Sequence, residues 1–144
     1  EIIGINTLKM MANSSEAMAF AIPSHIIIPL LSILEDGKTP VRALLGLIAM
    51  TVKEIQDRED EIQEIPEGID HGVFVTSVTP NSVGANAGIE VGDIILEMNG
   101  IDLVYIYQVR AELGKIVVGN NQTITASVYK KNTGTIETIE FVFP

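Results

Sequence analysis

The chain reads Gly88-Ile89-Glu90-Val91-Gly92-Asp93-Ile94-Ile95-Leu96-Glu97-Met98-Asn99-Gly100 in its most informative segment. Gly88 and Gly92 bracket a turn, and the apolar run of residues 94–96 predicts a short strand. Asn99-Gly100 is the pair best suited to a two-residue hairpin, because glycine adopts positive φ without steric cost and asparagine tolerates it. The segment therefore predicts a turn, a strand and a hairpin in close succession.

The composition is that of a packed globular protein rich in strands. The chain has 144 residues, room for one ordinary domain and a little more. Hydrophobic residues make up 47% and the mean hydropathy is +0.33, which argues against disorder. Tryptophan is absent and aromatic residues are 5%, so the core must be built from Ile, Val and Leu, and the β-branched residues favour strands.

The net charge is −10, and between residues 53 and 70 eight acidic residues stand against two basic ones. This balance repels nucleic acids and anionic membrane surfaces, so neither is expected as a partner. Asp57, Glu59, Asp60 and Glu61 lack the glycine bend and alternating ligands of a calcium loop. They predict a solvated face, and no metal or other cofactor is expected.

Cysteine is absent, which excludes disulfides, thiolate nucleophiles and cysteine metal sites and leaves the redox compartment open. No run approaches the roughly 18 consecutive apolar residues of a membrane span. The chain opens with Glu-Ile-Ile-Gly, without an initiator Met or a leader. We therefore expect a piece of a longer protein.

The first 38 residues are predicted to form a segment of their own. Residues 2–8 favour a strand and residues 9–16 an exposed loop, after which apolar character resumes at residues 17–22. A helix is expected over about residues 25–35, capped by Ser24 and kinked or shortened at Pro29. Gly37 should end it as the C′ residue, and the best boundary lies at residues 37–39.

The remaining residues predict a strand-rich domain. The acidic stretch of residues 53–64 favours a helix through its i,i+4 ion pairs, and residues 85–87 suggest a helical turn closed by Gly88. A further helix is expected near residues 105–114. The expected strands cover residues 44–52, 73–78, 94–98, 123–130 and 136–142.

A loop rich in leucine supplies the candidate binding motif, Arg42-Ala43-Leu44-Leu45-Gly46-Leu47. A peptide carboxylate needs several backbone N–H groups that point inward together, and glycine lets the chain bend closely around the anion. An ordinary strand start is the competing interpretation of a glycine in an apolar run. The segments that follow the motif favour its interpretation as a binding loop.

This loop resembles the carboxylate-binding loop of PDZ domains, and its place ahead of the other strands resembles the bacterial, permuted order. The downstream block of residues 72–82, 87–89, 92–93 and 99–100 is similar to the PDZ pattern along its full span. The resemblance implies an α+β, mainly β fold, a partly open barrel of five to six strands with two helices. It also implies a carboxylate site at Leu44, Leu45, Gly46 and Leu47.

The other wall of the expected groove is the helix near residues 105–114. Ile106, Val109 and Leu113 recur at helical spacing and share a face, with Val109 expected in the core. The predicted groove residues are Ile48, Ala49, Met50, Ile106, Arg110 and Leu113, with Arg110 at the rim. The alternative interpretation, in which all three apolar helix residues belong to the core, stays open.

Residues 1–7 and 19–24 carry a second resemblance, to the end of the trypsin-like domain of HtrA-type (Do-like) serine proteases. It implies two parts, a protease-domain remnant at residues 1–38 and a PDZ domain at residues 39–144. For the parent it implies an endopeptidase, a homo-oligomer and an extracytoplasmic location. For the fragment we expect a monomer or a strand-exchanged oligomer, because strands without their barrel expose unpaired edges.

Catalysis by this chain alone is not expected. The family's glycine-rich serine motif is absent, and His25 and His71 are the only histidines, neither of them near a glycine-flanked serine. Three hypotheses remain. The chain binds C-terminal or unfolded peptide segments, or it belongs to a protease that is active only with upstream residues, or it is an assembly domain whose groove is blocked by residues 1–38.

Overall fold

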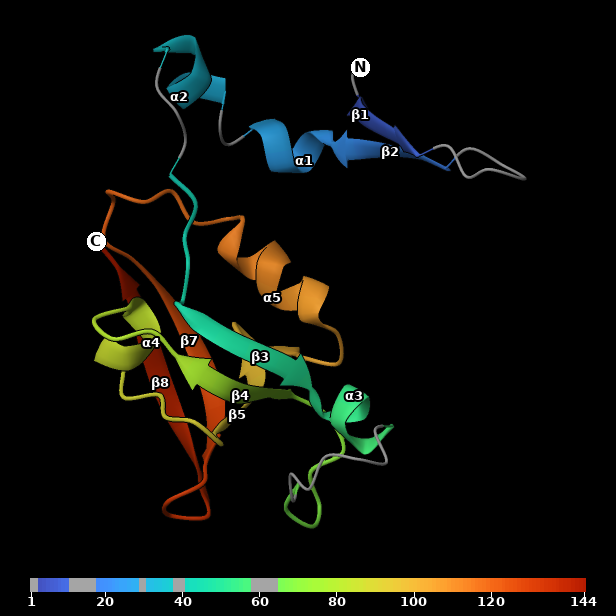
Figure 1. Cartoon of the computed structure of the whole chain (residues 1–144). Coiled ribbons are helices and arrows are strands. Elements are labelled where there is room, and N and C mark those ends of the chain that lie inside the picture. The colour runs from blue at the N-terminus through green and yellow to red at the C-terminus, as the bar shows by residue number, and fades with distance from the viewer. Residues whose placement is uncertain (1–2, 11–17, 29–30, 38–40, 58–64) are drawn as a thin grey trace. The chain divides into compact units, whose positions relative to one another are not determined.

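The computed structural model describes residues 3–10, 18–28, 31–37, 41–57 and 65–144. The chain divides into two compact units, Glu1–Val41 and Arg42–Pro144, and each is described by itself below. The predicted boundary between residues 38 and 39 lies outside the described residues. Figure 1 shows the elements of both units.

The first unit is a two-stranded hairpin followed by two short helices. Strands β1 (Gly4–Met10) and β2 (Met18–Pro23) pair antiparallel, and α1 (Ser24–Ile27) and α2 (Leu31–Glu35) follow. The helix predicted over residues 25–35 is thus divided, and residues 29–30, which include Pro29, lie outside the described part. Gly37 is the C′ residue, as predicted, with φ +69° and its N–H on the Leu34 carbonyl.

The prediction that Ser24 caps the first helix was wrong. Ser24 is the first helical residue, the N-cap is Pro23, and no side chain caps this helix end. The Ser24 N–H instead donates to the carbonyl of Ile3 at 2.9 Å. One of the amides at this helix start is thereby paired with the residue that precedes β1.

The second unit is built on one antiparallel sheet with the order β3-β4-β5-β7-β8. β3 and β8 end the sheet and do not pair with each other in the described part of the chain, so the barrel is partly open, as predicted. A two-residue strand, β6, pairs with β5. The strands are β3 (Leu47–Thr51), β4 (Val73–Val78), β5 (Ile94–Met98), β6 (Ile101–Asp102), β7 (Gln122–Lys130) and β8 (Thr135–Phe143).

Among the described residues three helices accompany this sheet, where the family resemblance implied two: α3 (Val52–Gln56), α4 (Val83–Asn86) and α5 (Ile106–Leu113). The predicted strand over residues 44–52 is shorter at both ends, because Gly46 has φ +71° and Val52 begins α3. Strands β4 and β5 have the predicted bounds. Asn99 and Gly100 both have positive φ and form the two-residue turn between β5 and β6.

Aliphatic side chains fill both faces of the central strands. Val73, Val75 and Ile95 belong to the main core with Phe141 and Phe143, while Phe74 and Ile94 belong to a smaller cluster with α3. Burial on both faces explains the nearly continuous apolar character of β4 and β5. The sheet is thereby a rigid base for the loops and helices at its β3 edge.

Candidate peptide-binding site

The loop of residues 44–47 is bent at Gly46, and its carbonyl groups are held from one side. The Gly84 N–H donates to the Leu45 carbonyl and the Thr79 N–H donates to the Gly46 carbonyl, each at 2.8 Å. Both donors belong to the residue 79–84 connection, which leads from the end of β4 into the first residues of α4. This connection therefore fixes the orientation of two successive peptide groups.

Peptide planarity decides where the amides of this loop point. In a trans peptide group the N–H points opposite to the C=O, and the described backbone has no cis bond. The Gly46 and Leu47 N–H groups therefore point away from the residue 79–84 connection. Within the described part of the chain, the Leu45 and Gly46 amides donate to no protein group. Successive free amides at a positive-φ glycine are a recurring way to bind an anion.

Two glycines allow the residue 44–47 loop to lie close to the residue 79–84 connection. A Cβ on Gly46 would lie 2.2 Å from the Cβ of Ser82, and a Cβ on Gly84 would lie 2.6 Å from Leu47 Cδ2. Ser82 is itself fixed, because its Oγ accepts from the Ala85 N–H and caps α4. Glycine is thus required at residue 46 for both conformation and space.

The outer edge of β3 continues from this loop. Backbone groups of residues 46, 48 and 52 bond on the β4 side, to Thr79 N, Thr76 Oγ1 and Gly72 O respectively. Strand alternation then turns the N–H and C=O groups of Leu47, Ala49 and Thr51 away from β4. The irregularity in the β3–β4 ladder places the extra residue, Thr76, on β4, so β3 keeps its alternation.

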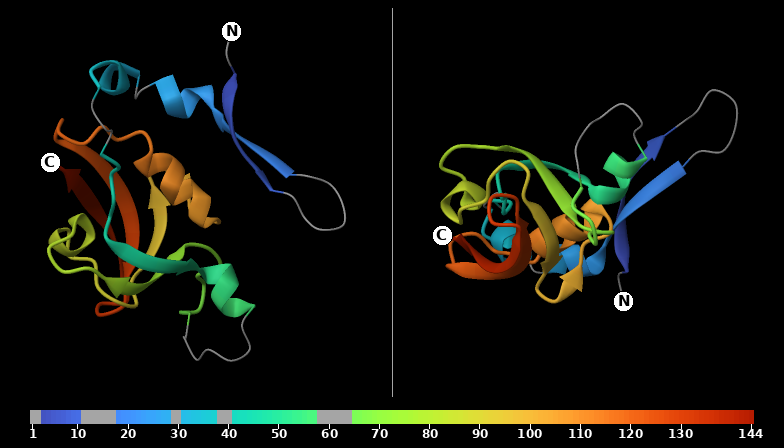
Figure 2. Two further views of the ribbon diagram at one scale, coloured as in Figure 1. Left: turned by 45° about the horizontal axis from the view of Figure 1, so that its top comes forward. Right: turned by 90° about the horizontal axis from the view of Figure 1, so that it is seen from below.

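Helix α5 runs along β3 on the side opposite β4 in both Figure 1 and Figure 2. Val109 is 9% exposed and belongs to the core, as predicted. Ile106 and Leu113 are partly buried and pack against the same core as Leu47 and Ala49, whereas Arg110 is exposed. The predicted site residues thus lie on the loop, the strand and the helix, and their part in binding stays a prediction.

Two polar side chains that the sequence analysis missed hold α5 in place. Gln108 Oε1 accepts from the Val104 and Tyr105 amides at 2.8 and 2.7 Å, and its Nε2 donates to the Asp102 carbonyl. Glu112, only 3% exposed, accepts from Asn99 Nδ2 at 3.1 Å and from Lys115. Both ends of α5 are therefore tied to the β5–β6 region rather than to β3.

The charge of Glu112 is stabilised in this setting. Burial by itself raises the pKa of its carboxyl, but hydrogen bonds from Lys115 and Asn99 and the Lys115 charge outweigh burial and lower the pKa. Asn99 is anchored in turn, since it exchanges backbone and side-chain hydrogen bonds with Thr125 of β7. An ionised Glu112 thus links α5 to the hairpin and through it to the sheet.

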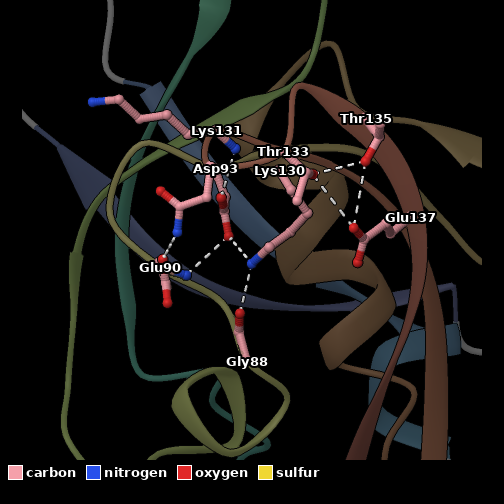
Figure 3. A network of polar contacts seen from close by, with 9 residues as sticks. Gly88, Glu90, Asp93, Lys130, Lys131, Thr133, Thr135 and Glu137 are labelled. Atoms are coloured by element: carbon pink, nitrogen blue, oxygen red, sulfur yellow. Dashed lines mark hydrogen bonds and ion pairs between the residues drawn. The ribbon is translucent and has the colours of Figure 1, made fainter.

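A second buried network holds the β7–β8 hairpin (Figure 3). Asp93 is fully buried and accepts from Lys130 Nζ at 2.5 Å, from the Lys131 N–H at 3.1 Å and from the Glu90 N–H at 2.9 Å. Lys130 Nζ also donates to the Gly88 carbonyl. The network joins the Gly88–Asp93 turn to the end of β7, away from the residue 44–47 loop, so these residues are scaffold.

Histidine and acidic side chains supply no second site in the described residues. His71 Nδ1 lies 2.6 Å from Asp70 Oδ1, and this hydrogen bond lowers the pKa of Asp70. No serine hydroxyl among the described residues bonds to His71, and none of their acidic and histidine side chains form a group able to hold a metal. Over the same residues, every helix is too short or too polar to cross a bilayer.

Comparison with known proteins identifies the class. Residues 42–119, more than half of the chain, match the PDZ domain family, and the chain belongs to that family. Its relatives are serine proteases of the HtrA type, as the sequence predicted. Serine protease Do-like HtrB of Bacillus subtilis is 32% identical over 128 residues, which are 86% of this chain and 28% of the relative. Periplasmic serine endoprotease DegP of Escherichia coli is 30% identical over 125 residues, 86% of this chain and 25% of DegP.

Solved structures show the same fold. The HtrA-type protease AlgW with a decapeptide matches with a TM-score of 0.69 and 23% identity, over 99% of this chain and 42% of that one. The HtrA3 PDZ domain bound to a phage-derived ligand matches with a TM-score of 0.53 and 22% identity, over 72% of this chain and 86% of that one. The chain spans about a quarter to a third of the curated relatives it matches.

Proposed function

We propose that this chain binds the free C-terminal ends of other polypeptides, in folded or unfolded partners. The observation that supports this most is the pair of carbonyls at Leu45 and Gly46 held from one side, which leaves successive amides directed to the other. The free carboxylate of a bound chain would supply the hydrogen-bond acceptor that those amides lack. The HtrA3 PDZ structure, bound to the peptide FGRWV, supports a peptide as the ligand class.

The bound segment would add a strand to β3. Its carboxylate would accept from the amides of Leu45, Gly46 and Leu47, and its backbone would run antiparallel to β3. Its last side chain would lie against the partly buried Leu47, Ile106 and Leu113. Ordering an extended peptide offsets much of this gain, so we expect micromolar affinity, about 8 kcal/mol.

Peptides with free and amidated C-termini test this mechanism. The probe is a library of eight-residue peptides that begin Gly-Ser-Gly-Ser, vary in the last four residues and end in an apolar one, titrated by fluorescence polarisation. We expect the best binders to lose at least about tenfold in affinity on amidation. Amidation removes the negative charge of the peptide carboxylate, to which the loop N–H groups would donate. Equal affinity for both forms would contradict the carboxylate mechanism and favour a blocked or purely structural domain.

For the whole protein we propose a serine endopeptidase in which this domain captures substrate or regulates the protease, with residues 1–38 as the end of the protease domain. The chain of 144 residues itself would bind and not cleave. Neither of its histidines adjoins a glycine-flanked serine in sequence. Incubation with unfolded casein should leave the casein intact, and any cleavage that scales with the chain's concentration would contradict this proposal.

A further inference from the structure

A hollow of about 320 Å³ lies between helix α4 and the end of strand β8. Helix α4 and β8 lie side by side in both Figure 1 and Figure 2. The lining residues come from α4 and its C-terminal end and from the last residues of the chain: Val83, Asn86, Ala87, Glu140, Val142 and Pro144. None of them has a part in the peptide-binding site proposed above, so the hollow is a separate feature of the domain.

Hydrogen bonds between β5 and β7 establish which backbone groups of β8 face its open edge. The Thr125 carbonyl accepts from the Asn99 N–H at 2.8 Å, and the Thr125 N–H donates to Asn99 Oδ1 at 3.2 Å. Both backbone groups of Thr125 therefore point to β5. Glu140 is directly opposite Thr125 in the β7–β8 ladder, so its N–H and C=O point away from β7. Alternation along the strand gives Thr138 and Val142 the same outward direction.

The walls of the hollow are mostly apolar and carry one charge. Val83, Ala87 and Val142 supply the apolar walls. The side chain of Glu140 is exposed and forms no hydrogen bond or ion pair with any described residue. The α4 side cannot neutralise it, because residues 76–89 contain no charged side chain. An arginine side chain matches this lining, since its apolar stem can lie against the walls while its guanidinium donates to the carboxylate.

We propose that an extended basic segment of another polypeptide adds as an antiparallel strand to β8 and places an arginine side chain in this hollow. The exposed glutamates of β8 repel an acidic strand and attract a basic one. A second copy of this chain is a poor occupant, because the chain has a net charge of −10. The ligand needs no free C-terminus, so this site is independent of the proposed function.

Antiparallel pairing decides which amides of the ligand bond to β8. A residue opposite Glu140 directs its backbone groups to β8, and its side chain lies on the same face of the sheet as the Glu140 side chain. When arginine occupies every second residue of the ligand, the arginine N–H groups bond to β8. The N–H groups of the residues between them point to solvent.

The probe is the peptide acetyl-Thr-Arg-Thr-Arg-Thr-amide, which offers no carboxylate to the residue 44–47 loop. Amide shifts of the ¹⁵N-labelled full chain of 144 residues give its dissociation constant and its location. We expect the largest shifts at residues 138–142, and at least about tenfold weaker binding when glutamine replaces both arginines. N-methylation of the arginines should also weaken binding at least about tenfold, and N-methylation of the threonines less than about twofold.

Two variants with a matched control test the role of the hollow. Glu140→Gln removes its charge and should weaken binding about fivefold. Glu137→Gln changes the net charge equally on the opposite face of β8, where Glu137 accepts from Thr133 and Thr135 (Figure 3), and should weaken binding less than about twofold. Val142→Lys, at a residue 52% exposed, places a competing cation beside Glu140 and should abolish binding. Circular dichroism and the thermal midpoint confirm that the variants fold.

Three results would overturn the proposal. Equal losses in Glu140→Gln and Glu137→Gln would show that net charge alone attracts the peptide. Any other pattern of N-methylation effects would exclude antiparallel addition to β8. Shifts centred on residues 44–47, or no shifts at all, would show that the hollow does not bind a basic segment. Binding of the free-carboxylate library is measured separately, so the proposed function stands or fails without regard to these results.

Discussion

β3 and β8 are both end strands of one sheet, but their sequences differ in the number of charged side chains along the unpaired edge. β3 has five residues without a charged side chain, and Ile48 on it is 64% exposed. β8 has nine residues and carries exposed glutamates at residues 137 and 140. Charges on an edge discourage pairing with another chain. The comparison indicates that charge protects the β8 edge, although Ile136 and Val142 are exposed there too, whereas no charge protects the β3 edge.

The contacts that fix the two edges differ as well. The start of β3 is shaped by backbone contacts at Gly46 and Gly84, which position amides without any charged side chain. The β7–β8 hairpin is fixed by the buried pair of Asp93 and Lys130. A site for a carboxylate needs donors without a competing anion, so the glycine-shaped edge suits it and the edge with glutamates does not.

We expect the largest effect on the free energy of unfolding, from a change in the buried pair that fixes the β7–β8 hairpin. Asp93→Ala removes the carboxylate partner of Lys130 and leaves it only the Gly88 carbonyl, in a site where the lysine side chain is 12% exposed. We expect the free energy of unfolding to fall by about 3–5 kcal/mol, as for other broken buried pairs. Urea denaturation measures this loss. Glu137→Ala is the exposed control and should cost less than about 0.5 kcal/mol. A loss below about 1 kcal/mol for Asp93→Ala would contradict the anchoring role.

Gly46→Ala should abolish most peptide binding. The new Cβ would meet Ser82 at 2.2 Å and φ is +71°, so the loop must rearrange and lose its aligned amides. We expect at least about a tenfold loss in affinity, or 1.4 kcal/mol. Gly134→Ala is the matched control, because Gly134 has φ +68° in the β7–β8 turn, with its nearest contact, Tyr129 Oη, at 3.6 Å. It should bind like the wild type. Equal loss in both variants would indicate general destabilisation.

We expect the ionised carboxylate of Glu112 to make the stability of the folded protein depend on pH. Its pKa is lowered in the folded state from the ordinary value of 4.5, so its contribution is present above that unfolded value and is lost as the pH falls through the folded value. Between pH 6 and pH 3.5, the thermal midpoint of the wild type should therefore fall further than that of Glu112→Gln. At pH 7 the variant should be less stable by about 1 kcal/mol. Parallel midpoint curves for the two proteins would contradict the role of the ionised carboxylate.

The smallest expected effect is on self-association. Replacing both edge glutamates, with Glu137→Val and Glu140→Val, removes the charges of β8 and should increase dimer formation in sedimentation velocity, by about 1 kcal/mol or less. Thr123→Val with Thr125→Val is the control, since these exposed residues lie on β7, an interior strand that stands between β5 and β8. Association by the control as strong as by the β8 variant would show that apolar surface, not the edge, is responsible.

The sequence predicted the elements whose signals are local. β4 and β5 have the predicted bounds because a short apolar run stands between turn-forming residues in each case, and Val109 is buried as its helical spacing indicates. The strand predicted over residues 44–52 was too long at both ends. Thr51-Val52-Lys53-Glu54 is a capping-box signature, and it would have placed the start of α3 correctly.

Contacts between residues distant in sequence could not be predicted from local sequence patterns. Asn99 and Glu112 are 13 residues apart and Asp93 and Lys130 are 37 apart, so only the closed sheet shows that each pair meets. The charge of Glu112 also offers no sign of burial, because most glutamates are exposed. The anchors of α5 thus follow from tertiary structure, whereas the Gly46 bend was indicated by the glycine together with the resemblance of its loop to a carboxylate-binding loop.

Amide chemical shifts are the most sensitive test of our proposal that the Leu45, Gly46 and Leu47 amides bind a chain-end carboxylate. A ¹⁵N-labelled full chain is titrated with the best library peptide in its free and amidated forms. We expect the largest proton shifts, downfield, at these three amides and only with the free carboxylate. Shifts of equal size with the amidated peptide, or shifts centred on β8, would contradict it.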